Sequence, residues 1–245
     1  MTYEKTRKGN PLQLTVEQHF HTAHAIAKFY NTNGNVEVKD INTGEVLQRH
    51  KRAKIFSTKR NWDERAEKGY MAHIEADFHN QIDSLNLGRP RDDAAISKYL
   101  ALWRLRHKFH LERSSDAPLF GIDGEYLTKE QQEILEKRGI GYINERAEIP
   151  ARQLTGIQIQ IGVDQLMQTL GGIKWGLLHS KNSQFLCADC YHRFLFIPVS
   201  PVLALAGNLP DQELTDAEVS IANHHSVNSA SQFYFGSYLE KCPIA

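Results

Sequence analysis

Apolar side chains recur at helical spacing in several segments of the chain. Between residues 61 and 85 they recur every four positions, at Trp62, Ala66, Tyr70, Ile74, Phe78 and Ile82. This ladder predicts a helix with one face packed on the core. Residues 92–113 are apolar around most of the helical circumference, which predicts a central helix with Asp92 or Asp93 as its N-cap. Four further helices are expected over 16–30, 128–138, 150–170 and 216–234.

Strands are predicted in two groups. Residues 36–40 and 45–49 flank the turn signal Asn42-Thr43-Gly44 and are typical of a β-hairpin. A short strand over 54–57 follows. After residue 172 the helical period ends, and short apolar runs predict strands over 173–179, 184–188, 193–199 and 202–206.

This order of elements predicts an α+β fold with helices packed against small antiparallel sheets. The 245 residues suffice for one large domain or two small ones. We expect a flexible leader over residues 1–15 and a single compact domain over 16–245.

Composition excludes several classes of protein. The chain has 29 basic and 29 acidic residues, and no stretch approaches the ~18 consecutive apolar residues of a membrane span. The first ten residues lack the apolar region of a secretory signal, and three cysteines are too few for a disulfide framework. We therefore expect a reduced, cytoplasmic protein with no membrane partner.

Short motifs along the chain point to a family. His19-Phe20, Lys28-Phe29 and Asn33-Gly34 lie early, Ile74-Glu75 and Leu102–Arg106 lie in two predicted helices, and Phe185–Asp189 and Pro198–Pro201 lie late. In these motifs the chain, from about residue 19 to 235, resembles a bacterial family known as domain of unknown function number four-two-three-eight. It departs from the family pattern by lacking the early Pro and by having Cys190-Tyr191 after the Asp. The family has no established activity, so the resemblance implies the fold and leaves the chemistry open.

Cys187-x-x-Cys190-x-His192 is the sharpest local motif. Two thiolates at this spacing can share one tetrahedral zinc ion, with His192 as a third ligand. A fourth ligand would have to come from His179 or Cys242, because the chain holds no second C-x-x-C pair. The alternative is a buried Cys187 in a strand and Cys190 in a turn. No cofactor motif is present, so zinc or another divalent metal is the one cofactor that these residues suggest.

A second candidate metal site lies on the two central predicted helices. Glu75 with His79, and His107 with His110, each share a helix face, and a meeting of the two faces would suit a transition metal. The alternative is a hydrogen-bonded core network in which Glu75 holds a loop amide or Arg104.

A histidine–carboxylate pair is the minimum for general acid–base catalysis. His19, His21 and His24 lie near the N-terminus, and Asp189 could join them across the fold. A metal-dependent hydrolase or nuclease would use His19, His24, Glu75 and Asp189. No Gly-x-Ser-x-Gly, P-loop or dinucleotide-binding motif accompanies them.

Residues 49–60 form the most basic segment. They hold six cations and no acid, at Arg49, Lys51, Arg52, Lys54, Lys59 and Arg60. Such a row suits a phosphate backbone or an acidic protein partner. The alternative is a solvated hairpin edge, where cations discourage strand-to-strand aggregation.

The sequence thus predicts one of two functions. The first is an intracellular protein that binds nucleic acid or a nucleoprotein complex through the basic hairpin. Small proteins of this type often act in the conflict between phages and bacteria, as defence components or as inhibitors of defence such as an anti-CRISPR. The second is a metal-dependent hydrolase or nuclease with a His/Glu/Asp site. The oligomeric state stays open.

Overall fold

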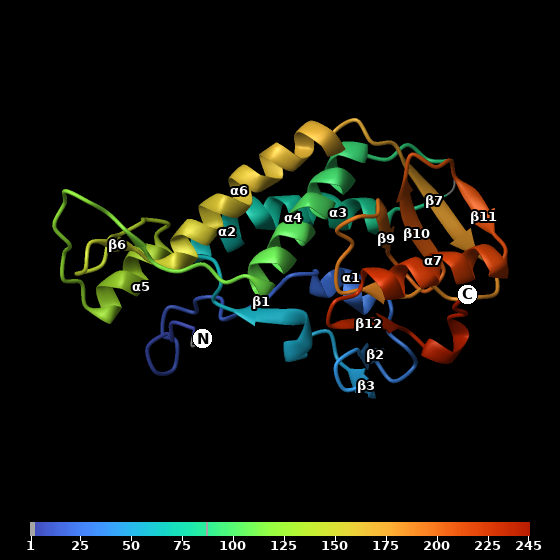
Figure 1. The fold of residues 1–245 in the computed structure, drawn as a ribbon, viewed down its shortest axis with the longest axis horizontal. Helices are drawn as coiled ribbons and strands as arrows, with labels where there is room; N and C mark the ends of the chain where they lie inside the picture. Colours follow the sequence, from blue (N-terminus) through green and yellow to red (C-terminus); the bar gives the residue numbers. More distant parts are fainter. Residues whose placement is uncertain (1–2, 87) are drawn as a thin grey trace.

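Two long helices cross at the centre of the molecule (Figure 1). The structure is a computed structural model that describes residues 3–86 and 88–245. Helix α4, Asp93–Leu111, packs against α6, Ala151–Leu170, and against α3, Ala72–Asp83. Gly162 of α6 permits this packing, because a Cβ there would lie 2.9 Å from both δ-carbons of Leu105 in α4.

Helix α3 continues a helical segment that begins at α2, Glu64–Ala66. A π-helical segment, η2, Glu67–Met71, joins the two. The side chain of Asp63 caps α2 by accepting a hydrogen bond from the amide of Ala66 at 3.0 Å. The helix predicted over 61–85 is therefore confirmed, with a π-helical segment inside it.

Small sheets flank the helix layer. One four-stranded sheet has the order β11-β7-β10-β9, with strands Gln212–Leu214, Trp175–Ser180, Leu203–Gly207 and Phe196–Pro198. The other has the order β3-β2-β12-β8, with strands Val46–Arg49, Val36–Asp40, Phe233–Gly236 and Cys187–Ala188. Two-stranded sheets join β1, Glu17–His19, to β4, Ser57–Lys59, and β5, Ala117–Pro118, to β6, Glu148–Ile149. All pairs are antiparallel except β11 with β7.

Shorter helices complete the fold. They are α1, Ala23–Ala27; α5, Lys129–Lys137; α7, Asp216–Ser229; and the 3₁₀ turns η1, Lys54–Phe56, and η3, Leu239–Lys241. A capping box of Thr128 and Gln131 opens α5, and the helix expected over 128–138 is confirmed. The predicted α+β class and the hairpin of β2 and β3 are confirmed, and the chain forms one compact domain.

Three predicted elements are wrong in part. The helix expected from residue 16 begins at Ala23, because Gln18 accepts hydrogen bonds from the amides of Asn61 and Trp62 and thereby holds β1 extended beside β4. The strand expected over 54–57 is η1 followed by β4.

The helix expected to residue 234 ends at Ser229, and β12 follows it. Phe233 and Phe235 are buried while Tyr234 between them is half-buried. This alternation has the period of a strand.

The N-terminal segment is attached to the helices. Residues 3–15 hold no helix or strand, and residues 1–2 of the predicted leader lie outside the described residues. Arg7 forms an ion pair with Glu133 of α5 at 3.0 Å, and Leu14 is buried. Among the described residues, no helix combines the length and the apolar character needed to cross a membrane.

His21 is a buried histidine between β1 and α1. Its ring stacks on the indole of Trp103, with the ring centroids 4.0 Å apart. The amide of Thr22 donates to the Tyr99 hydroxyl oxygen, so that hydroxyl can donate to Nδ1 of His21, 2.8 Å away. Burial lowers the pKa of His21 to about 3, because a charged ring would lose its hydration. The folded protein therefore contains the neutral ring.

Because His21 is buried as the neutral ring, we expect the folded protein to be less stable at acidic pH. Above the ordinary histidine pKa of about 6.5, His21 is neutral in both the folded protein and the unfolded chain. Below that pH the unfolded chain binds a proton at His21 while the folded protein does not, and this stabilises the unfolded chain. We expect the contribution of His21 to the free energy of unfolding to fall by about 2 kcal/mol from about pH 7 to about pH 5. Urea unfolding of wild type and His21→Phe at both pH values measures it. The control is His73→Phe at an exposed position, which should lose as much unfolding free energy between pH 7 and pH 5 as wild type does. If His21→Phe also loses as much as wild type, the prediction is contradicted.

Candidate metal site

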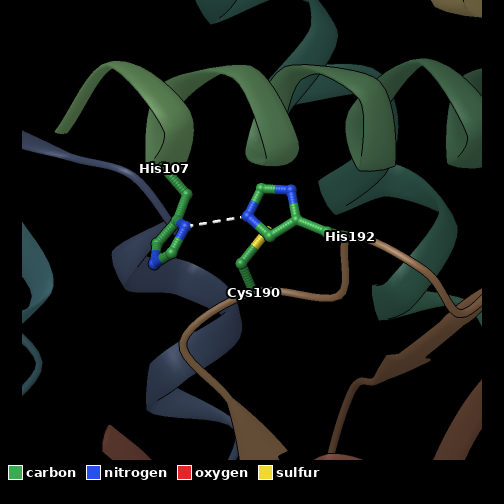
Figure 2. A group of neighbouring side chains, drawn as sticks. All are labelled: His107, Cys190 and His192. Carbon is green, nitrogen blue, oxygen red and sulfur yellow. Dashed lines mark hydrogen bonds between the residues drawn. The ribbon is translucent and has the colours of Figure 1, made fainter. Parts of the chain in front are cut away.

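Three side chains with metal-binding atoms meet below the C-terminal half of α4. His107, Cys190 and His192 each offer one nitrogen or sulfur atom, and these atoms all lie within 4.8 Å of one another. Nδ1 of His107 and Nε2 of His192 are 3.0 Å apart, joined by the dashed line in Figure 2. Ligand atoms that share a tetrahedral zinc ion lie about 3.3–3.6 Å apart, given bonds of about 2.1 Å to nitrogen and about 2.3 Å to sulfur. The 3.0 Å separation of the two imidazole nitrogens is slightly shorter than this spacing, and the 4.8 Å limit on the whole group is longer, so the side chains would shift to share one zinc ion.

Helix α4 also holds the loop that carries the other two ligands. Cys190 and His192 follow strand β8, while His107 projects from α4 above them (Figure 2). Trp103 donates from Nε1 to the Asp189 carbonyl at 2.8 Å. Arg104 donates to the Tyr191 carbonyl at 2.7 Å. One helix thus sets the position of all three ligands.

Asp189 orients the His107 ring. Oδ2 of Asp189 lies 3.4 Å from Nε2 of His107, on the side of the ring away from His192. The carboxylate also accepts hydrogen bonds from the amides of Ser231 and Gln232 at 3.0 and 2.7 Å. Burial alone would raise the pKa of Asp189, but the His107 ring and these amides outweigh it, and the pKa is lowered. A carboxylate behind a ligating histidine is the usual partner in metal sites.

The chemistry of the cluster favours metal ligation over nucleophilic attack. Cys190 is fully buried, and burial raises the pKa of its thiol, so the free side chain is uncharged and unreactive. A metal ion would stabilise the thiolate. His192 is exposed at one edge of the cluster, and burial of its inner part lowers its pKa, which favours the neutral ring that binds metals.

The structure brings together only part of the predicted zinc motif. Cys190 and His192 lie together, but Cys187 points into the core beside β12, where it pairs with Phe235 across the sheet. His107 takes the third position instead. Of His107 and His110, predicted to share a metal site with Glu75 and His79, only His107 joins a group of metal ligands within the described residues.

The four predicted catalytic residues bind different partners. Nε2 of His19 lies 2.9 Å from the Lys51 carbonyl oxygen, and Nε2 of His24 lies 2.8 Å from a carboxylate oxygen of Asp83. Asp189 serves His107 and β12, as described above. In the described part of the chain, no hydrogen bond joins any two of His19, His24, Glu75 and Asp189.

Glu75 pairs with a buried arginine between α3 and α4 and is itself partly exposed. Its Oε1 lies 2.5 Å from Nη1 of Arg106, whose side chain is 1% exposed. Glu67 lies 3.5 Å from the same guanidinium, and the Trp62 ring stacks against it at 5.3 Å. Glu75 is therefore placed as the counter-ion of Arg106.

The basic segment divides into buried and exposed cations. Arg60 is buried and pairs with Glu136 at 2.8 Å, so the expectation that it faces a partner is corrected: the α5 carboxylate holds it inside. Lys59 lies 3.7 Å from Glu17. The others, Arg49, Lys51, Arg52 and Lys54, are exposed or half-buried and form no ion pair among residues 3–86 and 88–245.

No family model, curated protein or solved structure matches this chain. The resemblance to domain of unknown function number four-two-three-eight therefore stays a prediction.

The buried ion pair predicts that Glu75→Ala destabilises the fold. Removing Glu75 leaves the buried charge of Arg106 with a single, longer contact to Glu67, and loss of one partner of a buried pair costs about 3 kcal/mol. Urea unfolding measures the loss. The control is Asp77→Ala at an exposed position of the same helix, expected to change stability by less than about 0.5 kcal/mol. A Glu75→Ala variant as stable as Asp77→Ala would contradict this role.

Proposed function

We propose that the protein is a metal-dependent hydrolase whose metal site consists of His107, Cys190 and His192. The observation that carries this proposal is the convergence of three ligand atoms within 4.8 Å. No fourth His, Cys, Asp or Glu of the described residues joins this group. Three protein ligands with one open position are typical of catalytic zinc, whereas structural zinc has four protein ligands.

The donor set favours zinc over harder ions. Two imidazoles and one thiolate suit Zn²⁺ and other late transition metals, while Mg²⁺, Ca²⁺ and Mn²⁺ prefer oxygen ligands. A zinc ion at an open position acts as a Lewis acid toward a carbonyl or phosphoryl oxygen. The protein's own contribution is to hold His107 through Asp189 and to leave His192 exposed at the surface.

The metal content of untagged protein tests this assignment. We expect about one equivalent of zinc in wild type and less than about a tenth of that in Cys190→Ser, because the thiolate is one of three ligands. Cys187→Ser is the matched control: it changes another fully buried cysteine of the same C-x-x-C pair and should keep its zinc. Loss of zinc in Cys187→Ser and its retention in Cys190→Ser would contradict the site.

Hydrolysis is measured with the same proteins. Wild type loaded with zinc should hydrolyse a generic phosphodiester or carboxylic ester, and a chelator should abolish the activity until zinc is restored. His192→Ala should lose the activity, and Cys187→Ser should keep it. Stoichiometric zinc with no hydrolysis of either substrate class would leave a metal site and refute the hydrolase.

A second function rests on a separate observation, the unpaired cations of the basic turn. We define the basic turn as Arg49, Lys51, Arg52 and Lys54, which run from the end of β3 to the start of η1. Its backbone is held in place, because the Lys51 amide donates to the Tyr30 hydroxyl at 3.0 Å. The Lys51 carbonyl contacts the ring of His19 on the other side. A backbone held at Lys51 that presents four cations without a carboxylate partner in the described residues supports binding of a nucleic acid backbone.

Charge reversal tests the basic turn. The triple variant Arg49→Glu, Lys51→Glu, Arg52→Glu should bind single- or double-stranded nucleic acid at least tenfold more weakly. The slope of log K against log salt should also fall by about 2–3, since each lost phosphate contact removes about one counterion. Reversal of three exposed cations elsewhere, Lys8, Lys68 and Arg138, is the control for net charge. Equal losses in both triple variants would contradict a specific role for the turn.

A further inference from the structure

A polar cavity of about 470 Å³ is lined by residues of α5, of the start of α6 and of the segment after α4. Figure 1 shows α5 and the start of α6 at one end of the molecule. Three arginines from separate segments line it: Arg60 after β4, Arg113 after α4, and Arg152 in the first turn of α6. Two carboxylates, of Glu4 and Asp116, line it as well. The remainder of the wall is polar and aromatic, with Tyr3, Asn61, Ser114, Gln132, Tyr142 and Asn144.

Arg60 leaves a donor unused at this cavity. Its side chain is 1% exposed, and Nη2 binds Glu136 at 2.8 Å. Its Nε is buried without a hydrogen-bond partner. A buried, unsatisfied donor of a charged group is rare in a folded protein and calls for a partner.

The backbone of Arg60 is also strained. Its φ of 41° lies in the left-handed region, which residues other than glycine, asparagine and aspartate rarely adopt. Such residues cluster at binding and catalytic sites, where the surrounding structure imposes the conformation. Here the Arg60 amide donates to the Val16 carbonyl at 3.0 Å, and the guanidinium is held by Glu136 at the other end.

The first turn of α6 adds amide groups to the same wall. This helix of 20 residues begins after Pro150, which has no side chain able to cap it. The Ala151 amide binds Asp116 at 2.8 Å, whereas the Arg152 amide donates no hydrogen bond within the described part of the chain. A free amide at the positive end of a long helix, here that of Arg152, favours an anion.

Arg113 supplies a charge without a counter-ion. Its guanidinium binds the hydroxyl oxygen of Thr58 at 3.1 Å and forms no ion pair among residues 3–86 and 88–245. Arg152, in contrast, already holds the carboxylate of Glu4 from the N-terminal segment. The cavity therefore combines two carboxylates, of Glu4 on Arg152 and of Asp116 on the Ala151 amide, with two guanidinium groups that have donors to spare. These guanidinium groups belong to Arg60 and Arg113.

We infer that this cavity binds a phosphorylated small molecule of about mononucleotide size. The phosphate would lie against Arg113, Nε of Arg60 and the first turn of α6, because planar guanidinium groups and helix N-termini both match phosphate oxygens. The amide, hydroxyl and tyrosine side chains of the wall would contact the uncharged part of the ligand. The volume of the cavity falls within the range of about 300–1,000 Å³ for small-molecule sites. This inference is independent of the proposed metal site.

Titration calorimetry of the full chain tests the inference with adenosine 5′-monophosphate, inorganic phosphate, adenosine and succinate. We expect the nucleotide to bind with a Kd of about 1 mM or tighter, phosphate more weakly, and adenosine and succinate not at all. Failure of both the nucleotide and phosphate to bind would overturn the inference. Succinate binding as tightly as phosphate would overturn the assignment of a phosphate ligand.

Variants locate the binding. Arg113→Gln should weaken nucleotide binding at least tenfold at an unchanged unfolding temperature, since its one protein contact is to a neutral hydroxyl. Glu4→Gln should strengthen binding several-fold, because it removes the carboxylate that competes for Arg152. Arg138→Gln is the control, an exposed arginine that is not part of the cavity wall. Equal affinities of Arg113→Gln and Arg138→Gln would place the ligand elsewhere and overturn the inference.

Discussion

A single buried carboxylate, that of Asp189, connects the helix layer to the sheet of β3, β2, β12 and β8. It accepts hydrogen bonds from the amides of Ser231 and Gln232, just before β12, and from the Ser231 hydroxyl. The backbone carbonyl of Asp189 accepts a hydrogen bond from the indole N–H of Trp103 in α4. A buried charge is tolerated only where such partners replace its lost hydration. Because these partners come from α4 and β12, both elements must dock before Asp189 is satisfied. The same residue then places Cys190 and His192 under His107, so the candidate metal site depends on this junction.

Buried arginines have a corresponding role among the helices. Arg106 pairs with Glu75 between α3 and α4, and Glu136 of α5 binds both Arg60 and Arg152. These charges are structural, and each has a carboxylate within hydrogen-bond distance. The cations of the basic turn have no such partner in the described residues. The contrast separates cations that a carboxylate of the fold holds from cations that have no such carboxylate, a distinction that net charge along the chain does not make. Arg60 belongs to the first group and still keeps an unpaired Nε.

Much of the secondary structure was predictable because its signals are local. Thr128 and Gln131 cap α5, Asp92 caps α4, and the turn at Gly44 closes the hairpin. The errors have a common cause: they fall where a distant segment overrides a local preference. Residues 17–19 are extended because Gln18 binds the backbone of Asn61 and Trp62, and β12 forms because Phe233 and Phe235 fill the core.

The amino-acid sequence by itself determined the fold class, most helices and the proximity of Cys190 to His192, because these depend on residues a few positions apart. Only the tertiary structure decided that His107 joins them and that Cys187 does not. It also decided that Arg60 is buried against Glu136 while Arg52 is exposed. The physical reason is the same in each case. Burial, ion pairing and metal geometry are properties of pairs of atoms in space, and the partners here lie 76 to 85 positions apart in the chain.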